Sequence, residues 1–142
     1  MKKIFVLLFG VFFYCAAKAQ VAPIYFYGDQ ITKDKEKATS YGVFCKLSTD
    51  SLYVLKHYDL YDNLLQTGFY KDEELKIPHG KFLVYKSVED FNYENETNFY
   101  LKDKDRFLFE QGNYKDGKKI GRWIQFFPDE KIFSITNYLE GY

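Results

Sequence analysis

Gly112-Asn113-Tyr114-Lys115-Asp116-Gly117 followed by Gly121-Arg122-Trp123-Ile124-Gln125-Phe126 is the stretch that decides the fold. Asp116-Gly117 is a turn-forming pair, because glycine adopts positive φ freely and aspartate tolerates it. β-forming residues precede and follow the pair, which predicts a β-hairpin. Gly121 then opens the second strand after the turn.

The same pattern occurs upstream, in Gly68-Phe69-Tyr70-Lys71-Asp72 and Gly80-Lys81-Phe82-Leu83-Val84-Tyr85. Both copies read Gly-x-Tyr-Lys-Asp, then a turn, then Gly-basic-aromatic-x-x-aromatic; the turn is longer in the upstream copy. A third copy starts at Asn137-Tyr138-Leu139-Glu140-Gly141. An internal repeat of this kind indicates stacked copies of one small structural unit.

The repeated unit is a β-hairpin, and a lone hairpin is marginally stable in water. Neighbouring hairpins therefore stack edge to edge and share a layer of aromatic side chains. The repeat predicts an all-β fold, a single antiparallel sheet of stacked β-hairpins. Gly68 and Gly112 fall within strands, where a glycine suggests close approach by an aromatic ring or another backbone.

Period-two alternation and β-forming residues predict strands along most of the chain after the N-terminal segment. We expect them at residues 40–47, 52–58, 64–70, 81–86, 97–101, 107–114, 122–127 and 132–138. The insertion between Tyr85 and Phe107 is rich in acids and Asn and is expected to form an extended hairpin. Residues 32–38 could form a helical turn, but a solvated charged loop is the preferred interpretation.

The repeat resembles the MORN-repeat variant of exported bacterial proteins, including the YwqK-like antitoxin type, whose pattern is Gly-x-Tyr-x-x-Gly-x-x-x-Gly-x-Trp-x-x-Tyr. The complete copy matches at Gly112, Tyr114, Gly117, Gly121, Trp123 and Phe126. The looser copy matches at Gly68, Tyr70, Gly80, Phe82 and Tyr85, and a truncated copy begins with Tyr138 and Gly141. The resemblance implies a MORN-like β-hairpin repeat domain over residues 51–142, preceded by an N-terminal extension at 20–50.

The first nineteen residues have the three regions of a secretory signal peptide. Met1-Lys2-Lys3 is basic, residues 4–14 are apolar, and Ala17-Lys18-Ala19 has the form that signal peptidase recognises. We expect cleavage between Ala19 and Gln20, and export to the periplasm or the cell surface. Cys15 as a lipid-anchor site is the alternative, but the residue before it, Tyr14, is too large. The mature chain has no predicted transmembrane segment.

Charge and composition exclude several classes of function. The chain has 20 basic and 20 acidic residues, and removal of Lys2, Lys3 and Lys18 leaves 17 basic residues and a mature net charge of −3. Nucleic-acid-binding proteins usually have a basic excess, and a net negative chain is repelled by anionic lipid. An aromatic content of 21% excludes a disordered chain.

Catalytic motifs are missing from the sequence. His57 and His79 have no cysteine or carboxylate at metal-ligand spacing, and there is no nucleophile or nucleotide-binding motif. We therefore expect no metal, no cofactor and no enzymatic activity. A small carbohydrate-active enzyme is the enzymatic alternative, and it would need two carboxylates about 5–10 Å apart.

The third repeat stops before its second strand, so residues 132–138 should form an edge strand. Its apolar residues are Ile132, Phe133, Ile135 and Tyr138, and it contains no charged residue. Unblocked edges pair readily with another strand, so we expect either a partner protein or a second copy of this chain to add there. Coverage by residues 139–142 or 24–27 is the alternative. The sequence thus favours an exported, non-enzymatic binding or scaffolding module, with an antitoxin or immunity-type protein as the alternative.

Overall fold

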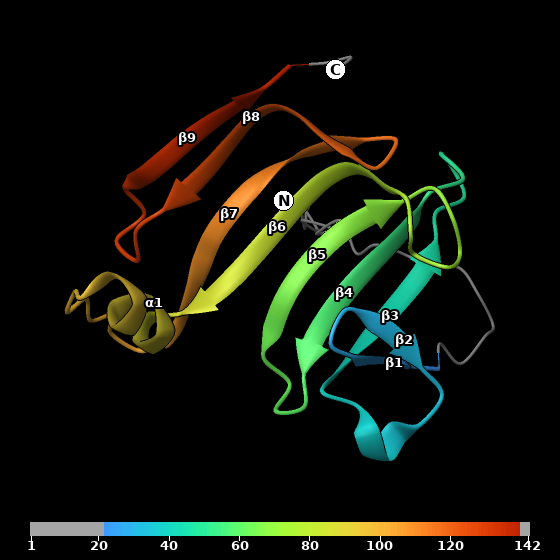
Figure 1. Ribbon diagram of the computed structural model, residues 1–142, viewed down its shortest axis with the longest axis horizontal. Coiled ribbons are helices and arrows are strands. Elements are labelled where there is room, and N and C mark those ends of the chain that lie inside the picture. The colour runs from blue at the N-terminus through green and yellow to red at the C-terminus, as the bar shows by residue number, and fades with distance from the viewer. Residues whose placement is uncertain (1–21, 140–142) are drawn as a thin grey trace, which may run out of the picture.

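The structure, a computed structural model, describes residues 22–139. These residues form one open antiparallel sheet of nine strands in the order β2-β1-β3-β4-β5-β6-β7-β8-β9 (Figure 1). The strands are β1 Ile24–Tyr27, β2 Gln30–Thr32, β3 Ser40–Lys46, β4 Tyr53–Asp59, β5 Leu64–Tyr70, β6 Pro78–Ser87, β7 Arg106–Lys115, β8 Lys118–Phe126 and β9 Ile132–Tyr138. The all-β, single-sheet prediction is confirmed.

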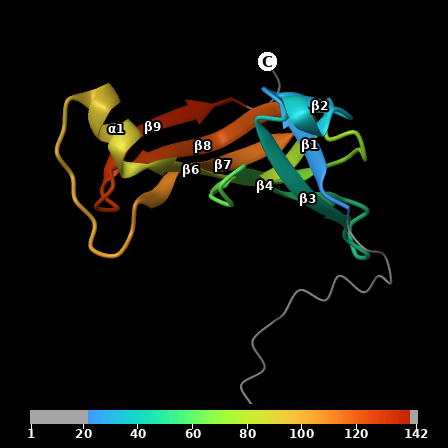
Figure 2. The ribbon, with the colours of Figure 1, turned by 90° about the horizontal axis from the view of Figure 1, so that it is seen from below.

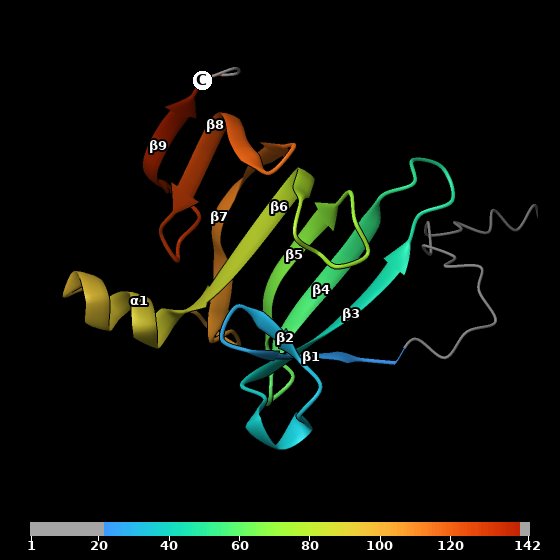
Figure 3. The same cartoon turned by 45° about the vertical axis from the view of Figure 1, so that its right-hand side comes forward.

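The sheet is strongly bent, and Figures 2 and 3 show α1 (Val88–Asn95) and the β1–β2 hairpin at its two ends, on the same side. We call that side the concave face. The strands β1, β2 and β3, which come from the expected N-terminal extension, pair into the same sheet as the repeats. Among residues 22–139, no helix is long and apolar enough to cross a membrane.

The turns follow from residues that accept positive φ. Asp116 and Gly117 have φ of 50° and 86°, which is the geometry of a two-residue hairpin turn. The β4–β5 and β8–β9 turns share another form, in which Asp62 and Glu130 take the left-handed conformation. In the longer β5–β6 turn, the Asp72 carboxylate accepts hydrogen bonds from the backbone N–H groups of residues 76 and 77.

The insertion after Tyr85 departs from the sequence prediction, because it forms the helix α1 and a loop. Ser87 caps the helix: its hydroxyl accepts a hydrogen bond of 3.0 Å from the backbone N–H of Asp90. The expected strand at residues 97–101 is wrong, since no strand forms there. The Asn92 side chain instead bonds to the backbone N–H and C=O of Phe99, which takes these groups out of reach of a β-ladder.

A second cluster of aromatic side chains holds α1 against the sheet. Phe91 is completely buried, and its ring centroid lies 5.5 Å from that of Phe107 and 5.6 Å from that of Phe133. The helix is therefore packed against the part of the sheet where Phe107 of β7 and Phe133 of β9 lie. The other helical segment is a 3-10 turn at Lys35–Lys37, which buries no residue. It lies within residues 32–38, so the preferred interpretation of that stretch as a loop is wrong over these three residues, where the alternative, a helical turn, forms.

Candidate partner-binding edge and the aromatic face

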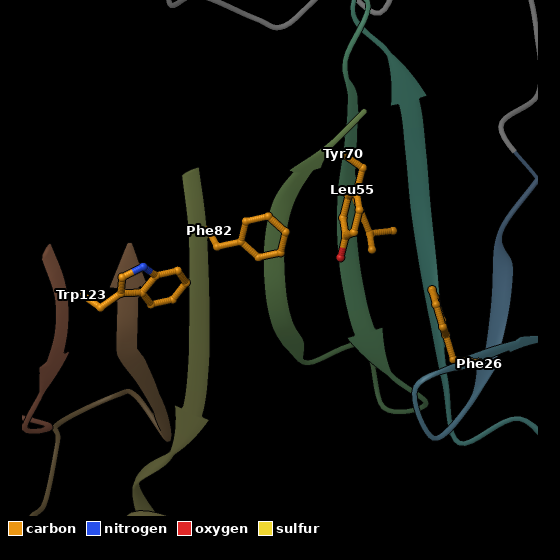
Figure 4. Close-up of a cluster of buried hydrophobic side chains, with 5 residues drawn as sticks. All are labelled: Phe26, Leu55, Tyr70, Phe82 and Trp123. Atoms are coloured by element: carbon orange, nitrogen blue, oxygen red, sulfur yellow. The ribbon is translucent and has the colours of Figure 1, made fainter. Parts of the chain in front are cut away.

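A row of rings crosses the concave face from β5 to β9, and Figure 4 shows its buried members together with Leu55 and Phe26. Consecutive rings meet edge to face, the favoured geometry for aromatic pairs. The centroid distances are 5.4 Å for Tyr70–Phe82, 4.7 Å for Phe82–Tyr114, 5.1 Å for Tyr114–Trp123 and 6.4 Å for Trp123–Tyr138. These five positions all come from the repeat, and we call them the aromatic ladder.

Glycines within the strands lie directly beneath two rings of the aromatic ladder. A Cβ built on Gly112 would lie 2.5 Å from Trp123 Cγ, and one on Gly68 would lie 2.5 Å from Phe82 Cζ. Each ring therefore lies directly on a glycine of the adjacent strand. This agrees with the close aromatic approach that the mid-strand glycines predict, and it explains how a single sheet can bury Trp123 to 3% exposure.

The sequence comparison of the repeats missed a related copy. Gly42 on β3 lies against Leu55 on β4, and a Cβ there would be 2.7 Å from Leu55 Cδ1. Two residues after this glycine comes Phe44, as Tyr70 follows Gly68 by two. The signal was weak because leucine replaces the aromatic residue that lies on the glycine in the other hairpins.

The remaining repeat positions serve the turns and the opposite face. Gly80 and Gly121 have the expected positive φ, 101° and 62°. The expectation that each opens a strand is wrong, since β6 begins at Pro78 and β8 at Lys118, and both glycines lie inside these strands near register shifts with the preceding strand. Tyr85 and Phe126 lie three residues after Phe82 and Trp123, so they face the other side of the sheet. Gly141, and the expected cleavage site between Ala19 and Gln20, lie outside the described residues.

Strand β9 forms one edge of the sheet. Within residues 22–139 it pairs with β8 alone, so one side of its backbone has no strand beside it. The exposed fractions are 50% for Ile132, 39% for Phe133, 42% for Ile135 and 37% for Tyr138. No charged residue, proline or described segment blunts this edge.

Neither of the two predicted cover segments lies along β9 in residues 22–139. Ile24–Tyr27 is β1, which pairs with β2 and β3 at the far side of the sheet. Coverage by that segment is therefore wrong. Leu139 is 76% exposed, and residues 140–142 lie outside the described part. The other sheet edge is β2, only three residues long, which leaves little backbone for pairing.

A small hollow of about 180 Å³ on the concave face contains His57. The Ser40 hydroxyl and His57 Nε2 lie 2.7 Å apart, and burial lowers the pKa of His57, against a weaker opposing effect of Asp29. A serine beside a histidine can be a nucleophile. Ser40 is only 5% exposed, however, and within residues 22–139 no carboxylate hydrogen-bonds to His57. The pair therefore fits a satisfied structural contact.

Among the described residues, no group of three or more His, Cys, Asp or Glu side chains could hold a metal ion. His57 and His79 lie apart: the first is on β4, and the second, on β6, accepts a hydrogen bond from the backbone N–H of Asp116. No family model, no curated protein and no solved structure matches the chain.

Proposed function

We propose that this protein is a non-enzymatic, exported binding or scaffolding module of the cell envelope, which captures a partner protein by adding a partner strand to β9. The single observation that carries the proposal is the open, uncharged and apolar edge of β9. It is seven residues long, close to the length of an average strand, so it offers a full ladder of backbone hydrogen bonds.

The side chains of β9 give this edge its selectivity. In strand addition, backbone hydrogen bonds supply affinity, and pockets for alternate side chains supply specificity. The Phe133 ring packs against two other rings: its centroid lies 4.9 Å from that of Phe127 and 5.6 Å from that of Phe91. On the concave side, Tyr138 ends the aromatic ladder. A partner strand would thus pack on rings that are already ordered, which reduces the entropy cost of binding.

The rest of the sheet acts as a rigid support for this edge. The aromatic ladder links β9 back to β5, and α1 fixes the end of β9 near Phe133. The resemblance to MORN-type repeats of exported proteins supports the same kind of role. An antitoxin or immunity function would be one case of it, with a toxin as the partner.

The proposal is tested by site-specific photocrosslinking in cells. A benzophenone amino acid replaces Tyr138 in one version and Ile31, on the opposite edge, in another. We expect a discrete crosslinked protein only from position 138. Ile135→Lys should abolish it, because a charge on an edge strand opposes pairing.

Ile31→Lys is the matched control, since Ile31 is 48% exposed on an edge strand, compared with 42% for Ile135. It should leave the crosslink from position 138 unchanged. Equal crosslinking from both edges, an unaffected Ile135→Lys variant, or no crosslink at all would each contradict the proposal.

A further inference from the structure

A larger hollow lies on the convex face, near the loop that joins α1 to β7. Its volume is about 620 Å³, within the range of small-molecule sites. Tyr85, Leu108 and Phe126 contribute apolar side chains from three successive strands. Tyr85 and Leu108 are register partners, and Phe126 holds the position in its repeat that Tyr85 holds in the other. The hairpin repeat therefore places two aromatic side chains on either side of Leu108, outside the core.

The charges around the hollow are predominantly positive. Lys102, Lys104 and Arg106 line it, and Glu130 is the one acidic residue that does so. Asp103 and Asp105 alternate with these cations along the chain and do not line the hollow. The lining of the hollow thus has three cations and one acid, although the whole chain has equal numbers of basic and acidic residues.

These cations have unused hydrogen-bonding capacity. In the part of the chain from residue 22 to 139, none of the three forms an ion pair, whereas Lys71, Lys86 and others do. Arg106 donates one hydrogen bond, from Nη2 to the backbone oxygen of Tyr85 at 3.3 Å. Its buried Nε has no partner among the described residues. A buried N–H of this kind is rare in folded proteins. Nε itself is not accessible to a ligand, so a bound anion would accept hydrogen bonds from the Nη groups at the end of the guanidinium.

We infer that this hollow binds a small aromatic anion, with a carboxylate or phosphate group among Lys102, Lys104 and Arg106 and a ring system against Tyr85 and Phe126. The charge selects an anion, because three cations and a single acid line the hollow, and the further electrostatic interaction of Arg106 with Asp59 involves a carboxylate outside that lining. The walls select a flat body, since aromatic side chains prefer to contact other rings. This site is separate from the β9 edge and needs no partner protein.

Isothermal titration calorimetry of the purified full chain with matched naphthalene compounds tests the inference. The probes are 2-naphthoate, 2-naphthyl phosphate, neutral 2-naphthylmethanol and cationic 2-naphthylmethylammonium. We expect one or both anions to bind and the neutral and cationic compounds to bind at least about tenfold more weakly, as loss of a charge-assisted hydrogen bond implies. The anion that binds with higher affinity shows whether the site prefers a carboxylate or a phosphate group.

Lys104→Glu should weaken binding of the anion by about tenfold or more, because it reverses one charge at the site. Lys104 is exposed, so this variant should stay folded. Lys118→Glu is the matched control, an exposed lysine in the β7–β8 hairpin outside the hollow, and should leave affinity unchanged. Ile135→Lys should also have no effect.

Arg106→Gln is expected to weaken binding as well, with circular dichroism as the check on its fold. The inference is overturned if no anion binds up to about millimolar concentration, or if the alcohol or the cation binds as tightly as the anions. It is also overturned if Lys118→Glu weakens binding as much as Lys104→Glu does.

Discussion

Gly112→Ala should be among the most destabilising single substitutions in this protein, although it adds one methyl group. That carbon would lie 2.5 Å from Trp123 Cγ, where about 3.5–4.0 Å is the normal contact distance. The indole would have to retreat by about 1 Å or more. Trp123 cannot move freely, since its Nε1 donates to the backbone oxygen of Asn113 at 3.1 Å and its ring contacts Tyr114 and Tyr138.

The magnitude follows from what the displaced ring loses. Trp123 is 3% exposed, and removal of a buried tryptophan typically costs about 3–5 kcal/mol. Gly112→Ala should reduce the free energy of unfolding by about 3 kcal/mol, a large share of the 5–15 kcal/mol typical of a domain. Trp123→Ala itself should cost about 3–5 kcal/mol.

The assay is a double-mutant cycle followed by urea unfolding. With Trp123 replaced by alanine, the methyl group at position 112 has space. Gly112→Ala should then be neutral or stabilising by about 0.5–1 kcal/mol, because alanine loses less backbone entropy in a strand than glycine does. The coupling free energy should be about 3 kcal/mol or more.

Gly117→Ala is the matched control. Gly117 has φ of 86° and no atom within 4 Å of a built Cβ, so its cost of about 1–2 kcal/mol is conformational alone. That cost should be the same with and without Trp123. The reasoning is refuted if Gly112→Ala is equally costly in both backgrounds, or if Trp123→Ala shifts stability by less than about 1 kcal/mol.

Three local features and the N-terminus give further predictions. Gly80→Val and Gly121→Val should each cost about 1–3 kcal/mol in urea unfolding, because φ is positive at both positions; wild-type stability would contradict this. Burial lowers the pKa of His57 in the folded state, so the unfolded chain binds the proton first and stability falls as the pH drops through about 6.5. His57→Gln should reduce that loss when urea unfolding is compared at about pH 7.5 and 5.5, and an unchanged loss would argue against it. Ser87→Ala should cost about 1 kcal/mol and speed amide hydrogen exchange in α1, unless the cap is dispensable. Intact mass of the exported protein should show cleavage between Ala19 and Gln20, and a retained N-terminus or a lipid on the protein would contradict it.

Local sequence patterns were sufficient for most of the strands. The strands Leu64–Tyr70 and Ile132–Tyr138 have the predicted limits, because alternation and turn residues act over a few positions. The α1 helix was missed although Ser87-Val88-Glu89-Asp90 carries the serine and acidic residue typical of a helix start. Its short acidic sequence resembled a loop tip, and its one deeply buried residue, Phe91, is recognisable only from its partners in the sheet.

The sequence by itself determined the repeated hairpins, because a hairpin depends on residues that are close along the chain. The truncated third repeat also predicted an edge at residues 132–138, but only the tertiary structure decided where the N-terminal strands pair and so that β2 is the other edge. The N-terminal strand β1 joins β3 at one side and leaves β9 open at the other, a choice between pairings distant in sequence. The hollow on the convex face also depends on the pairing of strands in the tertiary structure. Tyr85, Lys104 and Phe126 meet because neighbouring strands align them in space, and no spacing along the chain encodes that meeting.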